Sequence, residues 1–138
     1  MVELSSLGFG VSGAHGTRLV SRARTQALVA EAFDRGIRYF DTAPSYGAGE
    51  CEHRLGRALR AFDGETLAVS TKVGLSSHGL WGRRRDLSPE GVEDSLRASL
   101  GRLGREGVDL LILHGAAPHE LHSDLLARLR ALKRAGAY

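Results

Sequence analysis

Cysteine is almost absent from this sequence: Cys51 is the only one among 138 residues. A single cysteine excludes a disulfide within the chain and suits a reducing compartment such as the cytoplasm. Long apolar runs are missing too, since no segment approaches the roughly 18 residues that a membrane span requires. The first residues lack the positive region and the extended apolar stretch of a signal peptide. We therefore expect a soluble, cytoplasmic protein with no membrane partner.

Excess charge of one sign is also missing. The formal net charge is +3, and the basic residues are spread along the chain. The one dense basic run, Arg83–Arg85, lacks the further charge and interleaved aromatic residues of a nucleic-acid surface. We expect no nucleic-acid partner, and we interpret this run as a solvated loop. With 42% hydrophobic residues and no visible linker, residues 1–138 are predicted to form one domain.

The chain does contain a regular alternation of short apolar runs and longer amphipathic ones. Apolar runs without polar alternation are typical of strands that are covered on both faces, as in parallel sheets. We place four such strands at residues 7–11, 37–40, 67–71 and 108–113. Each is followed by apolar residues at helical spacing. These helical stripes lie within residues 28–33, 55–62, 92–103 and 125–132.

Several helix ends carry recognisable signals. Ser88 is a predicted N-cap, with Pro89 at the first helical position and Glu90 in the first turn. Gly36 and Gly136 follow the first and last stripes, where glycine commonly ends a helix. The helices are therefore predicted with definite boundaries as well as apolar faces.

The order of elements is thus four βα units, a parallel (β/α)4 arrangement in an α/β protein. Alternation of this kind implies a parallel sheet with right-handed crossovers. Two architectures fit it. One is an open doubly wound sheet, and the other is the N-terminal half of a TIM (β/α)8 barrel, whose usual length is about 250 residues. The pattern of apolar residues does not separate them.

Ionisable residues follow three successive predicted strands. Asp41 follows the second strand, Lys72 the third and His114 the fourth, and Tyr46 comes shortly after Asp41. Each residue alone has an ordinary explanation, since a polar residue at a strand end is usually solvated. Adjacent parallel strands lie about 4.8 Å apart, however, so these four side chains are expected to meet in one small volume.

Together these residue types make a proton donor. A lysine ammonium beside a tyrosine favours the phenolate, which makes the phenol a better acid. Asp41 can pair with Lys72 and hold it in place, and His114 can orient a substrate carbonyl by a hydrogen bond. A tuned acid beside an oxygen that gains negative charge is what hydride reduction of a carbonyl requires.

The chain resembles the aldo-keto reductase family in segments that extend over most of its length, at residues 7–10, 36–47, 52–56, 70–74 and 108–114. The resemblance implies a (β/α)8 fold and NADP(H)-dependent reduction of a small aldehyde or ketone. It also implies a catalytic set of Asp41, Tyr46, Lys72 and His114, with Tyr46 as general acid. By the same resemblance Asp41 contacts the nicotinamide ribose, and Val11 and Ser12 lie near the cofactor.

The resemblance extends only over the first half of that barrel, so the chain is expected to stop before a fifth strand. In the family the other half supplies most of the cofactor site. A half-barrel leaves its first and fourth strands unpaired at the edges, which favours pairing with another chain. We expect self-association or a complementary half. An alternative function is a non-catalytic half-barrel that acts as a binding or regulatory module.

Two smaller features receive ordinary interpretations. Cys51, at the start of the second helix, is assigned a packing or capping role rather than reactivity. His119 and His122 do not have the spacing of a zinc-binding His-Glu-x-x-His motif, and no metal site is predicted.

Overall fold

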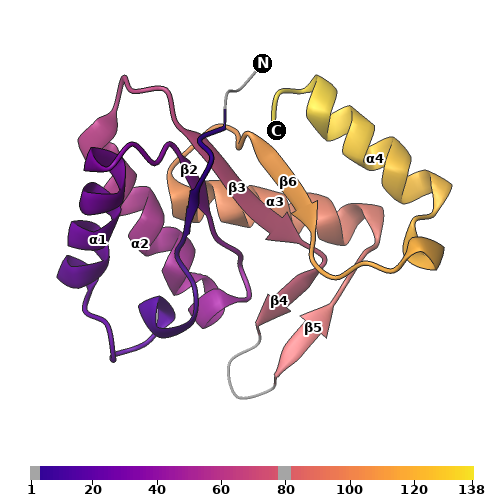
Figure 1. The fold of residues 1–138 in the computed structure, drawn as a ribbon. Coiled ribbons are helices and arrows are strands. Elements are labelled where there is room, and N and C mark those ends of the chain that lie inside the picture. The colour runs from indigo at the N-terminus through magenta and orange to yellow at the C-terminus, as the bar shows by residue number, and fades with distance from the viewer. Residues whose placement is uncertain (1–3, 78–81) are drawn as a thin grey trace.

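The computed structural model describes residues 4–77 and 82–138. Its main sheet contains four parallel strands, shown side by side in Figure 1. Their order in the sheet is their order in the chain: β1 (Gly8–Gly10), β2 (Tyr39–Asp41), β3 (Ala68–Val73) and β6 (Leu110–Leu113). Right-handed crossovers that always advance in one direction put every helix on the same face. This order is that of a half-barrel, and it excludes the doubly wound alternative.

Each strand of the main sheet leads to a helix, and each helix after the first packs beside the helix before it. The helices therefore form a row with α1 and α4 at its two ends (Figure 1). The helices are α1 (Arg22–Asp34), α2 (Glu50–Leu59), α3 (Pro89–Leu103) and α4 (Ser123–Arg134). The predicted cap is confirmed, because the Ser88 hydroxyl accepts a hydrogen bond from the Gly91 N–H. Short 3-10 helices complete the connections: η1 (Gly13–Gly16), η2 (Tyr46–Gly49), η3 (Arg60–Phe62) and η5 (Pro118–Glu120).

The core lies between the sheet and the row of helices. Phe40 and Val69 project from neighbouring strands and are fully buried, as are Leu55 of α2 and Leu96 of α3. Burying an aliphatic or aromatic side chain of this size stabilises a fold by about 1.5–3 kcal/mol. Cys51 is buried in the same core, which confirms that it has a packing role.

The interpretation of Arg83–Arg85 as a loop is wrong. These residues form strand β5, which pairs antiparallel with β4 (Leu75–Ser77) in a separate two-stranded sheet. Its side chains are exposed, and Arg85 forms an ion pair with Glu120. Sequence pattern did not indicate this hairpin because neither strand has an apolar face to bury. Among the residues described, no helix combines the length and the apolar character needed to cross a membrane.

Candidate active site

The four predicted site residues lie at one end of the sheet. Asp41 is the last residue of β2, Lys72 is the next-to-last residue of β3, and Tyr46 opens η2. His114 directly follows β6, and its backbone N–H donates to the carbonyl of Val73 at 2.8 Å. All four are therefore at the carboxyl ends of parallel strands, the end at which (β/α)8 barrels carry their active sites.

Lys72 and Asp41 form a closely bonded ion pair. The Lys72 ammonium donates to Asp41 Oδ1 at 2.7 Å and to Oδ2 at 2.6 Å, and it also donates to the carbonyl of Thr42 at 2.8 Å. An ammonium group has three donors, so these contacts use all of them. The Lys72 side chain is 12% exposed and that of Asp41 is 29% exposed. The ammonium is therefore held in one position, at the edge of solvent.

Tyr46 and His114 complete the cluster. The Lys72 Nζ lies 5.1 Å from the centroid of the Tyr46 ring. The rings of Tyr46 and His114 meet edge to face, with 5.9 Å between their centroids. The tertiary fold thus brings together all four residues, one cation, one carboxylate, one phenol and one imidazole, as the positions of the strand ends predict.

His114 is shifted toward its neutral form. Partial burial lowers the pKa of His114 below its usual 6.5, and the nearby charges of Lys72 and Arg83 lower it further. Its Nδ1 lies 3.4 Å from the hydroxyl of Ser45, a residue that is itself nearly buried. A neutral imidazole has one donor and one acceptor nitrogen, so the hydroxyl at Nδ1 influences which nitrogen carries the hydrogen.

Sequence reasoning missed Ser70. Its buried hydroxyl donates to Asp41 Oδ1 at 2.6 Å and lies 3.0 Å from the hydroxyl of Tyr39. Side chains alternate along a strand, so Ser70 shares a face with Lys72 two residues later. Thr71, between them, points to the helices and donates to Glu52 of α2. The i, i+2 relation to Lys72 was the signal that could have found Ser70.

Val11 and Ser12 lie beside the cluster in different environments. Val11 is fully buried, its N–H donates to the carbonyl of Asp41 at 2.9 Å, and its carbonyl accepts from the hydroxyl of Thr42 at 3.1 Å. Ser12, the next residue, is exposed. The backbone of Val11 therefore anchors the loop next to Asp41, and Ser12 is the one whose side chain is free to contact a ligand.

The turn that carries Tyr46 is held by an unusually close backbone contact. Gly47 has a φ of 59°, and Ala48, a residue that rarely takes this conformation, has a φ of 53°. A Cβ on Gly47 would lie 2.5 Å from the Cα of Gly16 in η1. Only glycine fits on both sides of this contact. The loop after β1 and the Tyr46 turn are thus locked together.

Several known proteins are similar to this chain in sequence or in fold. The chain is 32% identical to a D-threo-aldose 1-dehydrogenase from a Pseudomonas species, over 99% of this chain and 47% of the relative. It is 36% identical to a pyridoxal 4-dehydrogenase from Microbacterium luteolum, over 92% of this chain and 46% of the relative. The holo form of an aldo-keto reductase from Bacillus halodurans superposes with a TM-score of 0.85 and 28% identity, covering 97% of this chain and 44% of that one.

These matches have one feature in common, which is that the chain spans about half the length of each relative. The half it spans contains the strand ends with Asp41, Tyr46, Lys72 and His114. A sequence model of the aldo/keto reductase family matches residues 6–137, nearly the whole chain. The chain therefore belongs to the aldo-keto reductase family.

Proposed function

We propose that this chain supplies the proton-donor side of an NADP(H)-dependent reductase site that converts small aldehydes or ketones to alcohols. One observation carries the proposal: the ammonium of Lys72, held by Asp41, lies over the ring of Tyr46, and His114 meets that ring at its edge. The family membership of the chain supports oxidoreductase chemistry, and the two curated relatives are named as dehydrogenases.

In the proposed reaction Tyr46 is the general acid. As the carbonyl carbon is reduced, its oxygen gains negative charge and takes the proton from the Tyr46 hydroxyl. The positive charge of Lys72 stabilises the phenolate that remains. Asp41 and the carbonyl of Thr42 keep the ammonium in place, so little reorganisation is needed when the charge on Tyr46 changes.

His114 orients the substrate in this proposal. Its lowered pKa keeps the imidazole neutral near pH 7, so it adds no second positive charge beside Lys72. If the hydroxyl of Ser45 donates to Nδ1, the hydrogen of the ring is on Nε2. That N–H is then free to donate to the carbonyl oxygen and to direct it toward Tyr46.

The groups present fit the nicotinamide end of the cofactor. The side chain of Asp41 is partly exposed and can accept a hydrogen bond from a ribose hydroxyl. The exposed Ser12 lies next to Val11, whose backbone N–H is hydrogen-bonded to the carbonyl of Asp41. When bound, NADP(H) supplies the hydride. We propose Asp41, Val11 and Ser12 as the contacts of this chain with the cofactor.

Because the chain spans about half of its relatives, we propose that turnover requires a second (β/α)4 unit. Strands β1 and β6 are at the two ends of the sheet order, each with one edge unpaired among the residues described. A complementary half, or a second copy of this chain, would pair with these edges and close the site.

The test compares Tyr46→Phe with Tyr138→Phe, a matched control. The hydroxyl of Tyr138 donates to the carbonyl of Leu129 and lies outside the site. Carbonyl reduction is followed by loss of NADPH absorbance with a panel of small aldehydes, for the chain alone and with its complementary half. Loss of general-acid catalysis costs about 10²–10⁴ in rate. We expect this loss in Tyr46→Phe, unchanged NADPH affinity, and normal activity in the control.

Two results would count against the proposal. Equal activity in Tyr46→Phe and the unaltered chain would remove Tyr46 from the acid role. A folded protein that binds no NADPH, alone or with the complementary half, would instead support a non-catalytic binding module.

A further inference from the structure

A basic groove lies on the helix layer, apart from the proposed reductase site. It has a volume of about 770 Å³ and is lined only by helical residues. None of the four proposed catalytic residues lines it. We call it the arginine groove and define it by its lining: Arg22, Ala23 and Gln26 of α1; Glu50, His53, Arg54, Arg57 and Ala58 of α2; Arg60 of η3; and Gly101 and Arg102 of α3.

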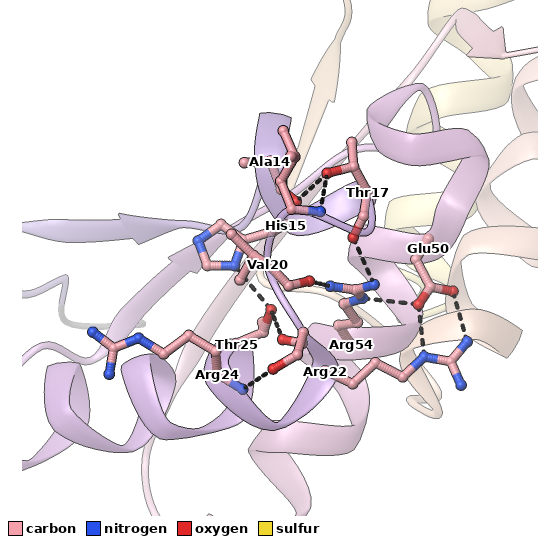
Figure 2. A network of polar contacts seen from close by, with 11 residues as sticks. Ala14, His15, Thr17, Val20, Arg22, Arg24, Thr25, Glu50 and Arg54 are labelled. Carbon is pink, nitrogen blue, oxygen red and sulfur yellow. Dashed lines mark hydrogen bonds and ion pairs between the residues drawn. The ribbon is translucent and has the colours of Figure 1, made fainter.

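The charge of the arginine groove is strongly one-sided, with five arginines and a single carboxylate, Glu50. That carboxylate is already occupied. Arg22 and Arg54 each donate to its Oε1 at 2.8 Å (Figure 2). These hydrogen bonds lower the pKa of Glu50 to about 2, so it stays ionised and paired. Arg102 pairs with the buried Glu52, so Arg57 and Arg60 are left as the groove arginines that pair with no carboxylate among the described residues.

Two arginines at the groove are available for a ligand. Arg57 and Arg60 are exposed, and within the described ranges 4–77 and 82–138 neither forms an ion pair. They follow Arg54 at intervals of three residues, which places like charges next to one another on a helical surface. Such neighbours repel, and the packing of the core does not need them because the side chains are exposed. A bound anion would relieve this repulsion.

The other walls of the groove are held in place. Arg54 is only 9% exposed and donates to the carbonyls of Val20 and Thr17 as well as to Glu50 (Figure 2). Arg102 donates through Nε to the buried Glu52. The groove therefore combines arginines that are held in place and partly shielded from water with two exposed guanidinium groups that form no ion pair among the described residues. A concave site of one charge sign concentrates the field acting on a counter-ion.

We propose that the arginine groove binds a small molecule bearing a di- or triphosphate group. Guanidinium groups match phosphate oxygens in a two-pronged geometry, and they do so better than ammonium groups. The volume is in the range of about 300–1,000 Å³ typical of small-molecule sites, and it exceeds the space that one phosphate fills. Two unpaired arginines beside three paired ones give the groove a net positive charge, which favours a ligand with several negative charges. A groove lined by residues of three neighbouring helices and of η3 favours a compact ligand over an extended strand of nucleic acid.

The test is calorimetric titration of the full chain with tripolyphosphate, ATP and AMP, against sulfate at matched ionic strength. The variant Arg57→Gln/Arg60→Gln removes the two free groups. The control Arg24→Gln/Arg130→Gln makes the same charge change at exposed helical arginines that do not line the groove. We expect one site for ATP and tripolyphosphate and weaker binding of AMP. The groove variant should bind about tenfold more weakly, and the control should change by less than about twofold.

Each result has a definite meaning. Equal affinity for tripolyphosphate and ATP assigns binding to the phosphates alone, whereas tighter ATP binding adds a contact with the nucleoside. Binding no stronger than that of sulfate, or equal losses in both double variants, would overturn the proposal. So would an oligonucleotide that binds more tightly than ATP through Arg57 and Arg60. Because the titration does not involve Tyr46, Tyr46→Phe should bind ATP normally, and failure here leaves the proposed reductase function untouched.

Discussion

The ion pair between Glu52 and Arg102 joins α2 to α3 and is unequally buried. Glu52 is 0% exposed, whereas the side chain of Arg102 is 24% exposed. Glu52 Oε2 accepts from Arg102 Nε at 2.5 Å, and Oε1 accepts from the hydroxyl of Thr71 at 2.7 Å. Thr71 is adjacent to Lys72 in β3, so the pair supports the strand that carries the proposed site.

Because the two side chains are buried to different extents, replacing Arg102 and replacing Glu52 should lower the free energy of unfolding by different amounts. Replacing Arg102 by glutamine leaves a fully buried carboxylate without a counter-charge, which costs about 3–5 kcal/mol. Replacing Glu52 by glutamine leaves an arginine that can turn toward water, and the new amide still accepts from Thr71. We expect this second change to cost about 1–2 kcal/mol, close to the loss of one charged hydrogen bond.

The assay is urea unfolding of Arg102→Gln, Glu52→Gln and the double variant, followed by circular dichroism. Because the double variant has no unpaired charge, it should be more stable than Arg102→Gln alone by about 1–2 kcal/mol. Arg97→Gln, which breaks only surface ion pairs at a side chain that is 69% exposed, should cost less than about 1 kcal/mol. A loss in Glu52→Gln equal to that in Arg102→Gln would refute the reasoning. So would a double variant less stable than either single one.

Three further outcomes follow from the packing and charges. Gly56→Ala places a Cβ 2.3 Å from the carbonyl oxygen of Leu103, so it should lower the free energy of unfolding by about 1–3 kcal/mol in urea titrations. Burial raises the pKa of Cys51 to about 11, so its thiol should react with a disulfide reagent at neutral pH only after denaturation. The pKa of Glu50 falls from 4.5 to about 2, so its stabilising contribution is complete above about pH 5 and is lost as the pH falls toward 2. The loss between pH 5 and 2 should therefore be smaller in Glu50→Gln than in the unaltered chain, as acid titration of unfolding can measure.

Much of the fold was predictable from local signals. The four predicted strands coincide with β1, β2, β3 and β6 to within about two residues, the usual uncertainty of such boundaries. Ser88 caps α3 as its residue type predicts. The pairing of β4 with β5 was not predictable, because neither strand shows the alternation of apolar and polar residues that marks a half-buried strand. Ser70 was overlooked because a serine within an apolar run stands out only when its i, i+2 relation to Lys72 is considered, and its partner Asp41 lies in another strand.

The sequence alone identifies the residues at the carboxyl ends of the strands, and these residues determine which chemistry the site can perform. Asp41, Lys72 and His114 each follow a local apolar run, and strand periodicity and turn chemistry are properties of neighbouring residues. The contacts between these residues depend on the strand order β1–β2–β3–β6, because this order brings together residues that are far apart in the chain. The arginine groove depends on tertiary structure even more strongly. Its lining comes from α1, α2, η3 and α3, and no sequence spacing relates arginines on helices that meet only through packing of the core.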